Sequence, residues 1–158
     1  MSKKMKEILV GSQFYSNFVP NNSDSSMEEP LILKPSMADT SRLQPFVDEA
    51  AEAAGISTRE CKRLRLAVEE AVANVINYGH ATAITISMAV EEDRLVLTID
   101  DDGQPFDPTQ GSQTDLTVPP DERPPGGMGI ILMHSMTDAL SYQRREGHNI
   151  LRIEKLKG

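Results

Sequence analysis

The stretch LAVEEAVANVINYGH, residues 66–80, decides the fold, because its apolar residues recur at a spacing of three and four and predict an amphipathic helix. The same stretch carries Glu70 and Asn74, which are four residues apart and therefore point to one side of the helix. A carboxylate and a hard amide oxygen on one face can hold magnesium and orient a hydroxyl or a water molecule. Glu-x-x-x-Asn alone is weak evidence for such a site. For the neighbouring Glu69 we favour an exposed polar stripe.

The sequence also predicts where helices begin and end. Ser57 lies three residues before Glu60, which is the spacing of a capping box, and Gly79 is a typical residue for ending a helix. A second helix is predicted upstream, with Asp39 or Thr40 as its cap.

Alternating apolar residues predict strands outside these helices. Residues 31–34 predict a short strand, residues 81–90 and 94–100 a hairpin, and residues 139–156 a second hairpin with its turn at 146–149. Since the strands come as hairpins and the helices in two groups, we expect an α+β fold. This pattern favours a two-layer sandwich, with a mixed, mostly antiparallel sheet covered by helices on one face, over a doubly wound parallel sheet.

A second group of polar residues follows the strand at 94–100. The segment DDDGQPFDP places Asp101 and Gly103 at the exit of that strand. An aspartate there can accept a hydrogen bond from an exocyclic amine, and a following glycine lets a ring approach the backbone. Residues 104–126 then form a proline-rich segment that is too long and irregular for a simple connection, which is typical of a lid.

A third group is the glycine cluster in PPGGMGI, where Gly127 and Gly129 stand at the start of a predicted helix. Backbone amides at a helix N-terminus bind anions, and glycines let a phosphate come close. The segment is not a P-loop, because no Gly-Lys-Ser/Thr follows, and Leu132 occupies the third glycine position of a Rossmann fingerprint. A hinge at the end of a loop is the alternative interpretation.

The order of the three motifs is more specific than any one of them. AVEEAVANVINYG, DDGQPFDP and GGMGI, separated by a hairpin and a long loop, resemble the ATPase superfamily of gyrase B, histidine kinases and mismatch-repair proteins, with the ATP-binding sandwich called the Bergerat fold. Within that superfamily the sequence looks most like the bacterial anti-sigma-factor serine/threonine kinases. The resemblance covers about residues 31–157.

The resemblance implies a role for each motif residue. Asn74 matches the asparagine that ligates Mg²⁺ through its amide oxygen, and Glu70 matches the general base. Asp101 matches the residue that accepts from the adenine amino group of ATP, and Gly103 keeps that pocket open. The glycines whose amides meet the phosphates match Gly127 and Gly129, and residues 104–126 match the ATP lid.

The implied function is an ATP-dependent kinase that phosphorylates a STAS-domain antagonist and sequesters a sigma factor by partner switching, with a homodimer as the family's assembly. Related kinases often carry a polar residue immediately before the glycine pair, where this chain has Pro124 and Pro125. The alternative is therefore an ATP-binding regulatory module without phosphotransfer.

The overall composition restricts the other classes. A net charge of −8 disfavours a nucleic-acid surface, since binding phosphates requires clustered lysines and arginines. With Cys61 as the single cysteine, the chain forms no internal disulfide. We find no membrane span and expect the cytoplasm. Residues 1–30 are predicted to be a flexible N-terminal arm, and residues 31–158 the ATP-binding domain.

Overall fold

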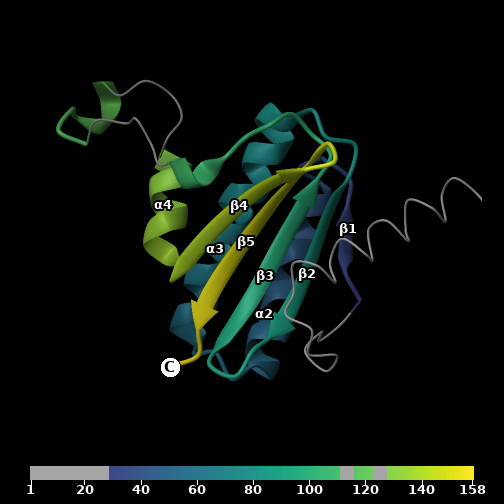
Figure 1. Ribbon diagram of the computed structural model, residues 1–158. Helices are drawn as coiled ribbons and strands as arrows, with labels where there is room; N and C mark the ends of the chain where they lie inside the picture. Colours follow the sequence, from purple (N-terminus) through teal and green to yellow (C-terminus); the bar gives the residue numbers. More distant parts are fainter. Residues whose placement is uncertain (1–28, 111–115, 123–127) are drawn as a thin grey trace, which may run out of the picture.

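A computed structural model describes residues 29–110, 116–122 and 128–158. Its centre is a five-stranded sheet in the order β1-β2-β3-β5-β4, and α2, α3 and α4 lie on one face of it (Figure 1). The strands are β1 (Leu31–Leu33), β2 (Ile84–Val90), β3 (Arg94–Asp101), β4 (Ala139–Arg145) and β5 (His148–Leu156). The helices are α2 (Leu43–Ala53), α3 (Thr58–Asn74) and α4 (Met128–Met136). The predicted α+β sandwich is confirmed.

The sheet is antiparallel at every pairing between the described strands, rather than mixed. The reason is the path of the chain after β3. It passes through α4 to the outer strand β4, and the β4–β5 hairpin then returns β5 to the gap beside β3. This return pairs Asp101 of β3 with Asn149 of β5, which are far apart in sequence.

The core lies between the sheet and the helices. In α3 the buried side chains follow the helical period predicted from the sequence, and in β2 and β3 every second side chain faces the same layer. Cross-strand pairs such as Ile86 with Ile99 and Met88 with Leu97 therefore pack together under the helices. The fully buried members include Leu33, Leu43, Val47, Leu64, Ile84, Ile86, Leu95, Leu97, Met133 and Ile153.

Of the two predicted N-terminal helix caps, one is confirmed and the other is wrong. The Ser57 hydroxyl accepts the backbone N–H of Glu60 at 3.2 Å, so this cap is confirmed. The predicted cap at Asp39 or Thr40 is wrong. A 3₁₀ turn over Asp39–Arg42 leads into α2, and the backbone is already helical at Ala38, so the extended conformation that a capping residue needs is missing.

The end of the long helix also differs in detail. After α3 the chain makes one wide π turn over Val75–Gly79, and His80 takes the left-handed conformation with φ of 51°. Gly79 therefore lies inside the last turn, and its carbonyl accepts the N–H of Gln104 at 2.7 Å. Such π turns occur frequently at functional sites.

The second hairpin turns one step earlier than predicted. Glu146 and Gly147 form the turn with φ of 51° and 81°, and His148 already belongs to β5. Two consecutive residues with positive φ are typical of a tight hairpin turn.

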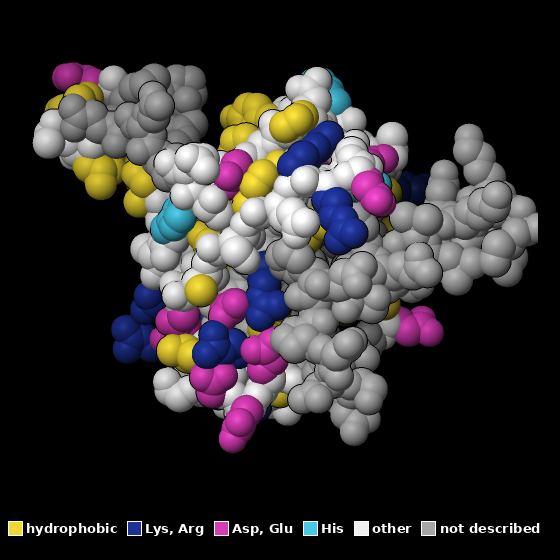
Figure 2. All heavy atoms as spheres, viewed as in Figure 1, with side chains coloured by type: hydrophobic (Ala, Val, Ile, Leu, Met, Phe, Trp, Pro, Cys, Tyr) yellow, Lys and Arg dark blue, Asp and Glu magenta, His cyan; other side chains and the backbone are white. Residues whose placement is uncertain are grey.

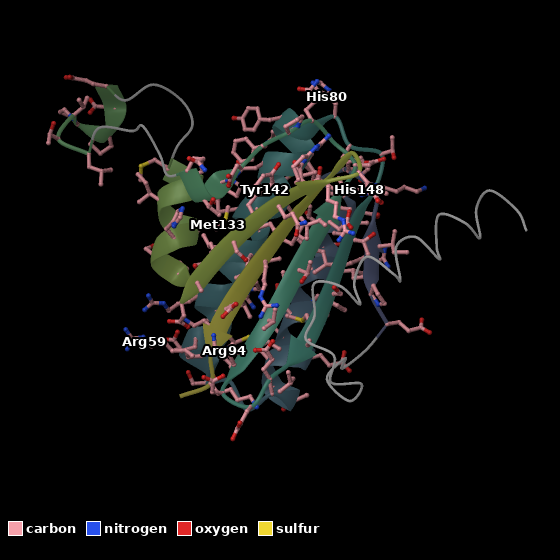
Figure 3. All side chains as sticks on the ribbon, in the orientation of Figure 1. Arg59, His80, Arg94, Met133, Tyr142 and His148 are labelled. Atoms are coloured by element: carbon pink, nitrogen blue, oxygen red, sulfur yellow. The ribbon has the colours of Figure 1, made fainter. Side chains whose placement is uncertain are left out.

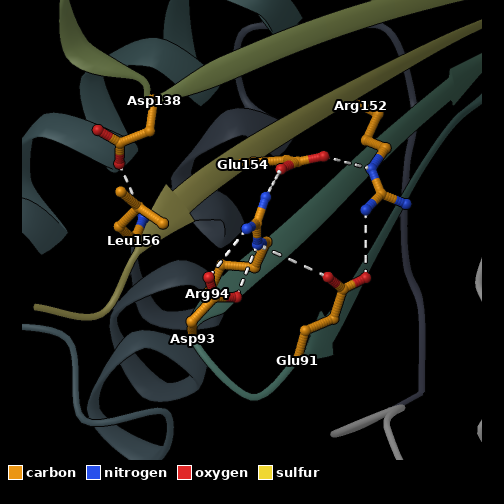
Figure 4. Close-up of polar contacts among 7 residues, drawn as sticks. All are labelled: Glu91, Asp93, Arg94, Asp138, Arg152, Glu154 and Leu156. Carbon is orange, nitrogen blue, oxygen red and sulfur yellow. Dashed lines mark hydrogen bonds and ion pairs between the residues drawn. The ribbon is translucent and has the colours of Figure 1, made fainter.

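At the far end of the sheet, charged side chains form a connected network (Figure 4). Arg94 contacts Asp93 at 2.8 Å and Glu154 at 2.6 Å, and Arg152 joins Glu154 at 2.9 Å to Glu91 at 3.1 Å. A network of this kind holds its members in place better than an isolated surface pair does. It lies where the hairpin between β2 and β3 turns.

Candidate nucleotide site

The three motifs meet at one end of the sandwich. The last turns of α3 carry Glu70 and Asn74, the end of β3 carries Asp101, and α4 begins beside them. Tyr142 of β4 lies toward this end of the molecule, away from Arg59 and Arg94 (Figure 3). A small cavity of about 30 Å³ lies among them, lined by Ala71, Asn74, Val75, Gly79, Asp101, Gln104, Phe106, Pro108, Met133, Tyr142, Asn149 and Leu151.

Asp101 is buried, with 4% of its surface exposed. Its Oδ1 accepts the N–H of Gly103 at 2.9 Å and the side-chain amide of Asn149 at 3.0 Å. Both bonds go to one oxygen, and no hydrogen bond from the described residues reaches Oδ2, which can therefore accept from a ligand. Burial raises the pKa of Asp101, while the bonds from Asn149 and Gly103 and the charge of Arg144 act in the opposite direction.

Gly103 occupies a position where a side chain does not fit. A Cβ added there would lie 2.5 Å from the carbonyl oxygen of Gly79 and 2.8 Å from Oδ1 of Asp101. The obstruction at Gly79 is backbone, which cannot swing away. The chain after β3 therefore lies directly against the end of the helix, and it forms one wall of the cavity.

Three further residues complete this part of the site and were missed from the sequence. Asn149 Nδ2 also donates to the carbonyl of Gln104 at 2.7 Å, and its Oδ1 accepts from the hydroxyl of Tyr142 at 2.6 Å and from the N–H of Phe106 at 3.3 Å. Arg144 donates to the carbonyl of Gly103 at 2.7 Å. No sequence motif marks these residues, because their position depends on the pairing of β5 with β3.

The structure brings Glu70 and Gly129 together. A Cβ on Gly129 would lie 2.5 Å from Oε2 of Glu70, so the carboxylate rests against the first turn of α4. A carboxylate in this position lies beside the backbone amides that the sequence predicts to bind an anion. The predicted base and one of the two predicted anion-binding glycines are thus neighbours.

Asn74 lies next to the cavity with an unsatisfied amide. Its Nδ2 is buried and has no hydrogen-bond partner within the described residues. Buried polar groups are nearly always paired, so this lone amide is a group that a ligand in the cavity can satisfy. Since the oxygen and nitrogen of an amide are told apart only by their partners, either atom can face that ligand.

The donors fit magnesium held together with phosphates. In the part of the chain that the structure describes, no three His, Cys, Asp or Glu side chains gather as a metal cage. Magnesium needs no such cage, because it is usually bound by one or two protein oxygens together with phosphates and water. Asn74 can supply one oxygen of this kind.

Other predicted parts of the site fall partly or wholly outside the described residues. Gly127 and the two prolines before the glycines lie there, as do the predicted arm up to residue 28 and parts of the predicted lid. The described beginning of the lid contacts α4, where Nε2 of His134 donates to the carbonyl of Pro108 at 2.9 Å. None of the helices among the described residues is long and apolar enough to cross a membrane.

Comparison with known proteins identifies the class. The model of the histidine kinase-like ATPase domain matches residues 33–155, so the chain belongs to this family. A serine/threonine-protein kinase, BtrW of Bordetella bronchiseptica, is 37% identical over 94 residues, or 57% of this chain and 66% of that protein. The serine-protein kinase RsbW of Bacillus subtilis is 29% identical over 112 residues, or 66% of this chain and 70% of that protein.

A solved structure shows the same fold. The crystal structure of the RsbU and RsbW domains of a Mycobacterium tuberculosis protein superposes with a TM-score of 0.54 and 13% sequence identity, over 82% of this chain and 33% of the other. The predicted superfamily and fold are thus confirmed. The predicted kinase function agrees with the relatives, which are named serine and serine/threonine kinases, although the matches span only about two thirds of their length.

Proposed function

We propose that this chain is an ATP-dependent serine/threonine protein kinase that acts as an anti-sigma factor in the cytoplasm. Its substrate is the serine or threonine hydroxyl of a STAS-domain antagonist. The observation that carries the proposal is the contact between Glu70 and Gly129, which puts a carboxylate beside the turn that is expected to hold phosphates. The named kinases among the relatives support the same reaction class.

In the proposed complex each residue has one task. Oδ2 of Asp101 accepts from the adenine amino group, and Gly103 lets the ring approach the backbone. The amides of Gly127 and Gly129 donate to phosphate oxygens. Mg²⁺, when bound, would be held by Asn74 together with the phosphates and would neutralise part of the phosphate charge.

Glu70 takes the proton of the partner's hydroxyl as its oxygen attacks the γ-phosphorus, and ADP leaves. In phosphoryl transfer of this kind, positioning and charge neutralisation provide most of the catalysis. The site geometry therefore matters more than any special reactivity of one group.

The experiment is a phosphotransfer assay on a STAS-domain antagonist with Glu70→Gln and with Glu69→Gln as the matched control. Glu69 is the exposed neighbour on the same helix and pairs loosely with Arg65 at 4.0 Å. We expect Glu70→Gln to lower the rate by about 10²–10⁴-fold, the usual contribution of a general base, with little change in ATP affinity. Glu69→Gln should retain the wild-type rate.

Unchanged phosphorylation by Glu70→Gln contradicts the assigned role of that residue. A wild-type protein that binds ATP but phosphorylates no antagonist favours the regulatory module without phosphotransfer.

Partner switching is tested separately. The sigma factor should be retained on the immobilised protein with phosphorylated antagonist present and be displaced by the unphosphorylated form. The homodimer expected from the family is tested by sedimentation.

A further inference from the structure

A basic hollow lies at the opposite end of α3 from the nucleotide site. We use this name for the open depression of about 550 Å³ lined by Arg59, Lys62, Arg63, Ser135 and Met136. Lys and Arg side chains gather at the lower left of the molecule in Figure 2, and Figure 3 labels Arg59 there. From Arg59 to Asn74 the helix rises by about 22 Å, so the hollow and the site are separate.

The charge of the hollow runs against that of the whole chain, which is −8. Arg59, Lys62 and Arg63 are spaced by three and four residues, so they share one face of α3. Arg59 and Lys62 make no ion pair or side-chain hydrogen bond with any residue in the described ranges. Their positive charge is therefore available to a ligand.

The nearest acidic residue is already engaged. Glu60 forms an ion pair with Lys155, a residue of β5 whose side chain is only 4% exposed, and it lies 3.9 Å from Nε of Arg63. Nε of Arg63 is buried and makes no hydrogen bond within the described residues. Because Nε is buried and faces Glu60, Arg63 contributes to the hollow through the positive charge of its guanidinium group and not through this donor.

The walls of the hollow are fixed before anything binds. Arg63 Nη2 donates to the carbonyl of Ser135 at 2.8 Å, and Lys155 Nζ donates to the carbonyl of Met136 at 3.3 Å. These bonds tie the end of α4 to α3 and to the sheet. A surface held in this way loses little conformational freedom on binding.

We propose that the basic hollow docks an acidic segment of a partner protein, with carboxylates on Arg59, Lys62 and Arg63 and one apolar side chain over Met136. Leu66, 41% exposed and one turn beyond Lys62, extends the apolar part of this surface. A nucleic acid suits the hollow less well. It requires a longer row of cations than the three that line this hollow.

The inference does not depend on phosphotransfer, and its test is separate from that of the kinase. The probe is a synthetic peptide in which Asp and Glu alternate with Leu, and the control peptide carries Asn and Gln in their place. Protein with ¹³C-labelled methionine methyl groups reports binding at Met136. We expect the acidic peptide to shift the Met136 signal and the control peptide to leave it unchanged.

Charge reversal gives the matched comparison. Lys62 and Lys34 are both exposed lysines, but only Lys62 lines the hollow. Lys62→Glu should weaken peptide binding about tenfold, because it replaces attraction by repulsion, and Lys34→Glu should change it less than about twofold. The midpoint of denaturant unfolding should be nearly the same in both variants, which shows that they are folded.

Three results overturn the proposal. They are an unshifted Met136 signal with the acidic peptide, equal binding by Lys62→Glu and wild type, and preferential binding of an oligonucleotide or of anionic lipid vesicles at the hollow. The last result assigns the surface to a different class of partner.

Discussion

The two ends of the nucleotide site differ in how completely their polar groups are paired. The base end is the part around Asp101 that we propose to bind adenine, and the phosphate end is the part around Glu70 and Asn74. At the base end, Asp101, Gly103 and Asn149 are already joined by hydrogen bonds in the folded protein. At the phosphate end, Asn74 has a buried amide nitrogen without a partner, and Glu70 rests against α4. An unpaired buried amide costs about 1–3 kcal/mol, so we infer that the ligand completes the phosphate end. Preorganisation is thus confined to the part that we propose to recognise the base.

The largest effect is expected from a side chain at the base end. Gly103→Ala puts a Cβ 2.5 Å from the backbone carbonyl of Gly79, so the chain must move. We expect a loss of about 3 kcal/mol in unfolding free energy, as in an overpacked core, and no measurable ATP binding. Denaturant unfolding and titration calorimetry measure the two quantities.

The control is Gly55→Ala. Gly55 has a positive φ of 76° but open space around its added Cβ, so only the backbone strain of about 1 kcal/mol remains. Equal destabilisation by the two substitutions would contradict the steric argument at Gly103.

A smaller effect is expected at the phosphate end from the same substitution. In Gly129→Ala the Cβ also lies 2.5 Å from its neighbour, but that neighbour is the flexible end of Glu70. We expect the carboxylate to swing aside, so that stability changes by less than about 1 kcal/mol while kcat falls about tenfold or more through lost positioning. A large loss of stability with unchanged kcat would show that the two ends respond alike.

The buried carboxylate of Asp101 predicts a pH dependence. Its pKa lies above the ordinary 3.8, so the folded protein holds this proton more tightly than the unfolded chain. The resulting stabilisation is complete below pH 3.8 and is lost as pH rises through the folded pKa. Asp101→Asn should therefore be more stable than wild type at neutral pH, with an advantage that shrinks in acid.

The same shift affects binding. A protonated Asp101 is a weaker hydrogen-bond acceptor. As the pH is lowered, ATP affinity should therefore begin to decline at a higher pH than it would with an ordinary aspartate. The difference between wild type and Asp101→Asn isolates this group from Asp100, whose pKa burial also raises. A flat difference in unfolding free energy from neutral pH to pH 4 would contradict the assignment.

The smallest effect concerns a supporting bond. Tyr142→Phe removes the 2.6 Å hydrogen bond to Oδ1 of Asn149. We expect a cost of about 1 kcal/mol in unfolding free energy and a few-fold loss of ATP affinity. Tyr78→Phe is the control, since Tyr78 is 59% exposed and should be neutral. Equal unfolding free energies and ATP affinities in the two variants would show that Tyr142 does not support the base end.

Local patterns explain why most of the fold was predictable. Helical spacing in α3 and alternation in β2 and β3 are properties of neighbouring residues, and so are the motifs that contain Glu70 and Asp101. The cap at Asp39 or Thr40 failed because the backbone enters α2 through a 3₁₀ turn.

Contacts between distant segments could not be predicted from the sequence. Asn149 reaches Asp101 only because β5 returns between β3 and β4, and no pattern in a single strand fixes that order. The basic hollow has the same origin. In the sequence, Arg59 and Lys62 look like part of an ordinary charged helix face. The hollow exists only because the end of α4 packs beside that face.

Calorimetric titration with ATP shows whether this chain binds the nucleotide through Asp101 and Asn74. The titration is run with and without Mg²⁺ on wild type and on Asp101→Asn. We expect binding by the wild type that Mg²⁺ strengthens and that Asp101→Asn abolishes without unfolding the protein. An absence of binding by the wild type, or equal binding by both proteins, would contradict this expectation.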